Sequence, residues 1–102
     1  MALFLLSYDI TEKNHDYQSL WDWLEKIGAG RILYSEWAVP WDNDSTALEL
    51  VNTALKHVME GDGIFVCELY DNDYSIAWRT LRVTDDAFRA LLTKYARSKS
   101  GQ

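Results

Sequence analysis

Asp9 is a candidate for a catalytic or ligand-binding residue, because it lies near the end of a long apolar run. Met1–Ile10 reads MALFLLSYDI and carries no charged side chain before Asp9. An unbroken apolar run of this kind predicts a strand that is buried on both faces, since a half-solvated strand alternates apolar and polar residues. Open sheets most often place their ligand sites at the carboxyl ends of such strands. An aspartate at a strand end also opens turns, and this second role for Asp9 stays open.

Side chains along this predicted strand divide between two faces, because the side-chain period of a strand is two. One face carries Leu3, Leu5, Ser7 and Asp9, and the other carries Phe4, Leu6, Tyr8 and Ile10. The carboxylate is therefore predicted to share a face with one hydroxyl group and two leucines.

Three helices are predicted from apolar side chains that recur at helical spacing. The first begins near Tyr17 and ends at Gly28, the second begins after Thr46 and ends at Gly61, and the third spans 84–97. The second and third each follow a threonine that can accept a hydrogen bond from a free backbone N–H, which is typical of a helix start.

Runs rich in aromatic and branched residues predict three more strands, at 31–39, 63–69 and 74–80. Together with the helices, this order is close to that of a ferredoxin-like βαββαβ unit. The strict ferredoxin-like order needs two strands between the first two helices. Residues 31–41 would therefore have to hold a hairpin in place of a single strand.

The expected fold class is α+β, a ferredoxin-like sandwich in one domain of residues 1–102, with a core at 1–80 and an added C-terminal helix at 84–97. Two helices can cover only one face of a four-stranded sheet, yet the first strand is apolar on both faces. A second copy of the chain is the simplest cover for the other face. This predicts a twofold homodimer packed sheet to sheet.

Composition narrows the classes of function. The chain has 102 residues, of which 48% are hydrophobic, and a formal net charge of -6, which counts against broad binding to a phosphate backbone. Cys67 is the single cysteine, so no internal disulfide can form and nothing argues for export. The apolar start is too short to span a bilayer. A cytoplasmic protein without membrane contact is expected.

Two stretches carry a family resemblance. Residues 6–10 (LSYDI), the helix that follows them, and residues 30–37 (GRILYSEW) together resemble the CRISPR-associated protein two family, the small dimeric subunit of the spacer-acquisition machinery. They also resemble the VapD-like toxins and SinR-like proteins of the same fold. The resemblance covers residues 1–69. It implies a ferredoxin-like homodimer in which the Asp9 carboxylates of two protomers face each other and hold one Mg²⁺, so that Asp9 is both metal ligand and catalytic residue.

The resemblance also implies a nucleic-acid-binding role for Tyr8, Arg31 and Ser35. Tyr8 and Ser35 would flank the paired carboxylates, and Arg31 would contact a phosphate. Simpler roles remain open: Tyr8 as a core residue, Ser35 as a small residue in tight packing, and Arg31 in a salt bridge with Asp9 or Glu36. The family often has several basic residues after the first strand, whereas this chain offers only Lys13.

Three functions follow from these residues. The first is a metal-dependent endonuclease that cuts RNA or DNA at the paired Asp9 residues, with His15 as a candidate general base. The second is a dimeric bridge that holds integrase subunits and nucleic acid without hydrolysis. The third is a non-catalytic toxin–antitoxin or regulatory dimer that binds another protein. Whether the chain is an enzyme stays open between them.

Overall fold

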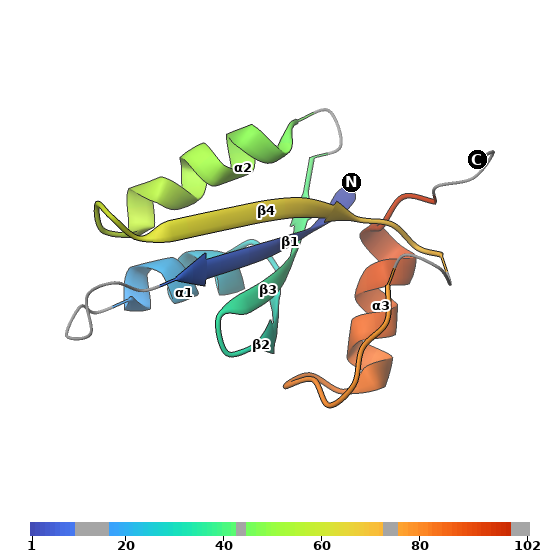
Figure 1. The fold of residues 1–102 in the computed structure, drawn as a ribbon. Helices are drawn as coiled ribbons and strands as arrows, with labels where there is room; N and C mark the ends of the chain where they lie inside the picture. Colours follow the sequence, from blue (N-terminus) through green and yellow to red (C-terminus); the bar gives the residue numbers. More distant parts are fainter. Residues whose placement is uncertain (10–16, 43–44, 73–75, 99–102) are drawn as a thin grey trace.

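A four-stranded antiparallel sheet with helices on both faces forms the described part of the chain. The structure, a computed structural model, describes residues 1–9, 17–42, 45–72 and 76–98. Its elements in chain order are β1 (Ala2–Asp9), α1 (Gln18–Lys26), β2 (Gly30–Leu33), β3 (Glu36–Trp41), α2 (Ala47–Ala54) with a 3₁₀ turn η1 (Leu55–His57), β4 (Gly63–Leu69) and α3 (Asp85–Tyr95). The strand order is β2-β3-β1-β4. The class is α+β, and the order is compatible with a ferredoxin-like fold (Figure 1).

The strand predicted from Met1 is the inner strand β1, which pairs with β3 on one side and β4 on the other. Its face with Phe4 and Leu6 packs against α1 and α2, and Leu6, Leu24 and Leu50 are completely buried there. The predicted start of α2 is confirmed, because the Thr46 hydroxyl accepts a hydrogen bond from the Glu49 N–H at 3.2 Å. Ile10, the last residue of the predicted strand, lies outside the described residues.

The single strand predicted at 31–39 is wrong, because the chain turns back between β2 and β3. The Arg31 side chain donates to the Tyr34 carbonyl oxygen through Nε at 2.9 Å and Nη2 at 2.7 Å, and so closes the turn. The register shifts between Arg31 and Leu33, which adds an irregularity beside the turn. The hairpin that the ferredoxin-like order required is therefore present. Aromatic and branched residues continue across it, so no turn signal is visible in this stretch of sequence.

The second face of the sheet is partly covered by the chain itself. Leu3, Ile32 and Ala38 on this face pack with Phe88 and Leu92 of α3. In Figure 1, α3 lies toward the end of the sheet where β1 begins. The predicted start of α3 is confirmed, since the Thr84 hydroxyl accepts from the Ala87 N–H at 3.1 Å. A second copy is thus not needed to cover the half of this face that α3 occupies.

The strand predicted at 74–80 is wrong over its described part, because residues 76–80 form no strand. Ile76 and Trp78 nevertheless pack into the core beneath α3. The Trp78 ring meets Phe88 edge-on at 4.7 Å between centroids, and its indole N–H donates to Asp85 at 3.1 Å. The alternating pattern therefore reflects the burial of one side of an irregular segment. At Thr80 the backbone has a positive φ of 59°, which is not a strand conformation. Residues 74 and 75 lie outside the described residues.

Among the described residues, no helix has the length and apolar character needed to cross a membrane.

Candidate functional site

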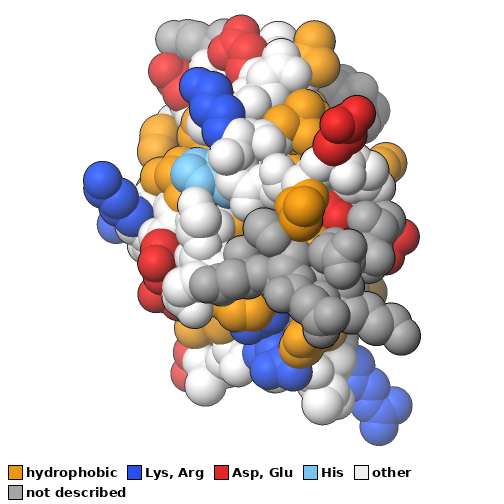
Figure 2. Space-filling model, turned by 90° about the vertical axis from the view of Figure 1, so that its left-hand side faces the viewer, with side chains coloured by type: hydrophobic (Ala, Val, Ile, Leu, Met, Phe, Trp, Pro, Cys, Tyr) orange, Lys and Arg blue, Asp and Glu red, His pale blue; other side chains and the backbone are white. Residues whose placement is uncertain are grey.

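Asp9 ends β1 on the sheet face that α3 partly covers, at the end that α3 does not reach. Its partner in the register is Gly63 of β4. A Cβ added at Gly63 would lie 3.6 Å from the Asp9 Cβ, so this glycine leaves the side of the carboxylate open. Asp9 is exposed and borders a hollow of about 220 Å³, lined also by Ser7 and Phe65. Figure 2 shows the side of the molecule that lies on the left in Figure 1, and acidic and hydrophobic side chains lie near one another on it.

Asp9 has both polar and apolar neighbours on this face of the sheet. Ser7 pairs with Glu36 of β3 on one side and with Phe65 of β4 on the other. Glu36 is thus a diagonal neighbour of Asp9, at the spacing where long side chains interact. Phe65 is 63% exposed and belongs to β4, an edge strand of the sheet. This surface, defined by Ser7, Asp9, Glu36 and Phe65, is called the open end of the sheet.

The described residues bring few potential metal ligands together at the open end of the sheet. Over residues 1–9, 17–42, 45–72 and 76–98, no group of three or more His, Cys, Asp or Glu side chains is close enough to hold a metal ion. His15, the candidate general base, lies outside the described residues. The carboxylates of Asp9 and Glu36 and the hydroxyl of Ser7 are hard oxygen ligands of the kind that Mg²⁺ prefers.

Tyr8 lies on the opposite face from Asp9 and is 5% exposed. Its hydroxyl accepts a hydrogen bond from the Trp21 indole N–H at 2.9 Å and donates to the Tyr34 carbonyl oxygen at 3.3 Å. Its ring stacks on Tyr17 with 6.5 Å between centroids. Tyr8 therefore joins β1 to α1 and to the hairpin turn, which is the core role left open from the sequence.

Arg31, in β2, and Ser35, in the turn that follows, belong to the same hairpin. The Arg31 guanidinium lies on the α1 side of the sheet, 4.9 Å from the ring centroid of Trp21 and 5.7 Å from that of Trp37. The Ser35 carbonyl oxygen accepts from the Tyr8 N–H at 3.0 Å. The structure thus brings Tyr8, Arg31 and Ser35 together around the hairpin, and it separates Tyr8 and Arg31 from Asp9 by the thickness of the sheet. Their role in nucleic-acid binding stays a prediction.

A second arginine reaches the same turn from a distant part of the chain. Tyr34 is 59% exposed, and the guanidinium carbons of Arg31 and Arg82 lie 4.9 and 5.4 Å from its ring centroid. The Arg82 N–H donates to the Ile32 carbonyl oxygen at 2.9 Å, which fixes its segment beside β2. These three residues, Arg31, Tyr34 and Arg82, form an arginine–tyrosine cluster. No spacing in the sequence could have revealed it, because Arg82 lies far along the chain.

The pKa values of Cys67 and Glu68, which are neighbours on β4, depart from their ordinary values. Burial, and then the charge of Glu36, raise the pKa of the Cys67 thiol, which disfavours the reactive thiolate form. The hydrogen bond from Arg97 lowers the pKa of the Glu68 carboxyl. The Arg97 guanidinium donates to both Glu68 oxygens, at 2.6 and 2.5 Å, and thereby fastens the chain after α3 to β4.

No protein-family model matches this sequence, and no solved structure matches the chain. The candidate function therefore depends on the geometry of the open end of the sheet and of the arginine–tyrosine cluster. Of the two, the open end carries the carboxylates and the cluster carries the positive charge.

Proposed function

We propose that the chain forms a twofold homodimer through the open end of the sheet, with the Asp9 residues of the two protomers facing each other. The observation that carries the proposal is the pairing of an exposed carboxylate with an exposed phenylalanine on a face that α3 covers only in part. Phe65 is 63% exposed, and covering it in a dimer removes apolar surface from water. The dimer of this proposal is the one that the resemblance to the CRISPR-associated protein two family implies.

Facing carboxylates give the proposed dimer its chemistry. Two carboxylates brought close together repel, and a divalent cation such as Mg²⁺ relieves the repulsion. In the dimer, Asp9 and its symmetry mate would hold the cation, with Glu36 and Ser7 beside them. When bound, Mg²⁺ supplies charge stabilisation for the hydrolysis of a phosphodiester bond. The activity proposed is that of an endonuclease acting on RNA or DNA, with Asp9 as the catalytic residue and metal ligand.

The arginine–tyrosine cluster supports nucleic acid as the substrate. The exposed Tyr34 ring offers a stacking surface for a base, and Arg82 beside it offers a positive charge for a phosphate. Arg31 uses Nε and Nη2 on the Tyr34 carbonyl oxygen, so it holds the turn and adds charge. Tyr8 holds the same turn through hydrogen bonds to the carbonyl oxygens of Tyr34 and Ser35. This local cluster provides contact with nucleic acid despite the net charge of -6.

A cleavage assay with matched variants tests the proposal. Labelled single-stranded RNA and double-stranded DNA are incubated with Mg²⁺, Mn²⁺ or chelator, using the wild-type protein, Asp9→Asn and a control, Asp71→Asn, at an exposed aspartate outside the open end. We expect metal-dependent cleavage by the wild type and the control, and at least a hundredfold loss in Asp9→Asn. Equal activity in Asp9→Asn and the wild type would refute a catalytic role for Asp9.

Dimer stability gives a second readout that does not depend on turnover. Because Asp9→Asn removes the repulsion between carboxylates, the variant should dimerise more tightly than the wild type in chelator, and added Mg²⁺ should strengthen only the wild-type dimer. A wild-type dimer that is indifferent to Mg²⁺ would argue against a shared cation. That result would favour the integrase-bridging role, since a bridge needs the dimer but no metal.

A non-catalytic regulatory or toxin–antitoxin dimer is the alternative, and exposed apolar residues on a second surface favour it. Leu48 of α2 is 65% exposed and Leu55 of the following turn is 47% exposed, on the side of the sheet away from Asp9. Such residues suit contact with another protein. This alternative predicts a dimer that cleaves neither RNA nor DNA with any metal, and that loses a protein partner on Leu48→Asp.

A further inference from the structure

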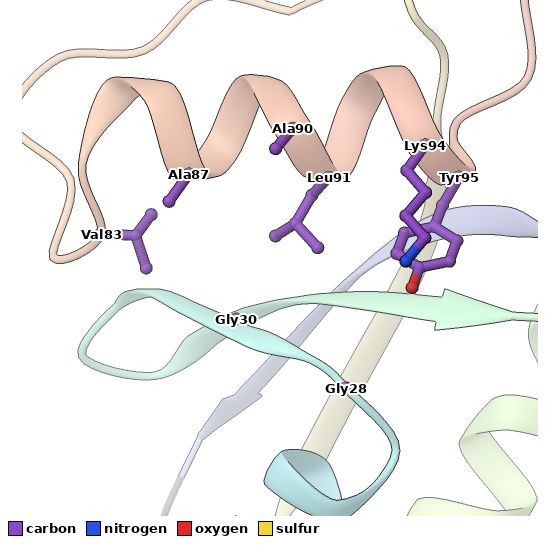
Figure 3. Close-up of a pocket in the computed structure, with 8 residues that line it drawn as sticks. All are labelled: Gly28, Gly30, Val83, Ala87, Ala90, Leu91, Lys94 and Tyr95. Atoms are coloured by element: carbon purple, nitrogen blue, oxygen red, sulfur yellow. The ribbon is translucent and has the colours of Figure 1, made fainter.

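A cavity separate from the open end lies between α3 and the edge strand β2. Its volume is about 390 Å³, which is within the usual range of about 300–1,000 Å³ for small-molecule sites. Figure 3 shows Val83, Ala87 and Leu91 along one side, and the backbone of Gly28 and Gly30 opposite them. None of these residues belongs to the hollow beside Asp9. This cavity is therefore independent of the proposed nuclease site.

Glycines keep one wall of this cavity free of side chains. An added Cβ at Gly30 would lie 3.0 Å from the Leu91 Cδ1, a tight contact to which the leucine side chain would have to adjust. Gly28 has a φ of +88°, a backbone angle that residues with a side chain rarely adopt. The space where its Cβ would lie is open, with no contacting atom within 4 Å. The space between α3 and β2 is thus bounded by bare backbone on one side and by apolar side chains on the other.

A lysine and a tyrosine mark one end of the cavity. In Figure 3 the side chains of Lys94 and Tyr95 run side by side from the last turn of α3 toward the sheet. The Lys94 Nζ lies 5.2 Å from the Tyr95 ring centroid. Among the described residues, Lys94 has no carboxylate oxygen within 4 Å of its ammonium group, whereas Arg97 forms an ion pair with Glu68. The cavity lining itself contains no acidic residue.

We infer that this cavity binds a small amphipathic carboxylate, with its hydrocarbon body along Val83, Ala87 and Leu91 and its carboxylate at Lys94 and Tyr95. The charge decides the class of ligand: an ammonium and a phenolic hydroxyl at one end of an apolar space suit an anion with an apolar body. A neutral hydrocarbon would leave the lysine unused, and a polyanion would bring further charges against the apolar wall.

Sodium octanoate is the probe for a first test, followed by ¹⁵N–¹H correlation spectra of the labelled protein. Octanoate should shift the amide signals of Gly28, Gly30 and the α3 residues of the cavity, and octylamine should not. Lys94→Gln should weaken octanoate binding roughly tenfold or more, because it removes a charge-assisted hydrogen bond. Lys26→Gln is the matched control, since Lys26 is an exposed lysine in the last turn of α1.

A second variant makes the test independent of charge. Ala87→Phe places a ring in the cavity from an exposed position on α3, so the protein should stay folded while octanoate binding is lost. Equal octanoate affinity in wild type and Lys94→Gln, equal binding of octanoate and octylamine, or signal shifts confined to other parts of the molecule would each overturn the inference. A failure of the Asp9 cleavage assay would leave it unaffected, since the two sites share no residue.

Discussion

Replacing Phe65 by alanine should dissociate the proposed dimer while leaving the monomer folded. Phe65 projects from β4 beside Ser7 and is 63% exposed in the single chain. It therefore contributes little to the core of the monomer. In a twofold dimer through the open end, the Phe65 residues of both protomers would be buried at once, so that one substitution acts twice.

The size of the effect follows from the exposed area. A phenylalanine presents roughly 200 Å², so about 100 Å² per chain would be lost on truncation to alanine. For two chains, about 200 Å² at about 25 cal/mol per Å² gives an upper limit of about 5 kcal/mol for the loss in dimerisation free energy that Phe65→Ala causes. Area converts incompletely into affinity at protein interfaces. Half of that limit would still raise the dimer dissociation constant by roughly 60-fold.

Sedimentation velocity over a dilution series measures this dissociation constant directly. Leu48→Ala is the matched control, because Leu48 is equally exposed, at 65%, but lies on α2 at the other face of the sheet. Far-ultraviolet circular dichroism of both variants checks that the monomer fold is retained. We expect Phe65→Ala to shift the monomer–dimer midpoint to higher concentration and Leu48→Ala to leave it unchanged.

Two results would refute this reasoning. A wild-type protein that sediments as a monomer at every concentration would remove the dimer itself, and with it the paired carboxylates. A dimer that Leu48→Ala dissociates and Phe65→Ala does not would place the interface on the helical face. In that case Asp9 would remain a single exposed carboxylate, and the regulatory alternative would become the better account of the chain.

Two further predictions concern stability. Tyr8→Phe leaves the Trp21 indole N–H without its acceptor and should lower the free energy of unfolding by about 1–2 kcal/mol in urea denaturation, with dimerisation unchanged; an unaltered stability would show that water replaces the hydroxyl. Glu68→Gln should lower the melting temperature at neutral pH, where the ion pair with Arg97 is formed. Because Arg97 lowers the pKa of Glu68, the stabilisation is complete above the ordinary carboxyl pKa of about 4.3 and is lost as the pH falls through the lowered value. A difference between wild type and Glu68→Gln that persists at the most acidic pH would contradict this assignment.

Some parts of the fold were predictable because their signals are local. The apolar run that forms β1 needs no knowledge of its neighbours, since its length and lack of alternation already indicate burial on both faces. Thr46 and Thr84 each begin a helix by accepting a hydrogen bond from an N–H three residues on, so their roles are visible in a window of a few residues. The place of Asp9 at a strand end follows from the same run.

Other parts depended on contacts between distant segments. The hairpin between β2 and β3 turns where Arg31 binds the Tyr34 carbonyl oxygen, and the surrounding residues would suit one continuous strand equally well. The pattern at Ile76 and Trp78 is that of a strand, but these side chains alternate because α3 covers them, without any ladder of hydrogen bonds. Alternation alone does not distinguish these two forms of burial.

The apolar run at the start of the chain is enough to show that β1 needs cover on both faces and that Asp9 stands near its end. The packing of α3 sets which part of the second face is covered, and hence that Asp9 and Phe65 are exposed together. The same packing brings Arg82 to Tyr34, and Lys94 to the cavity beside Gly30. The two kinds of information differ in range, because strand and helix preferences arise within a few residues, whereas the exposure of a surface depends on the packing of distant segments.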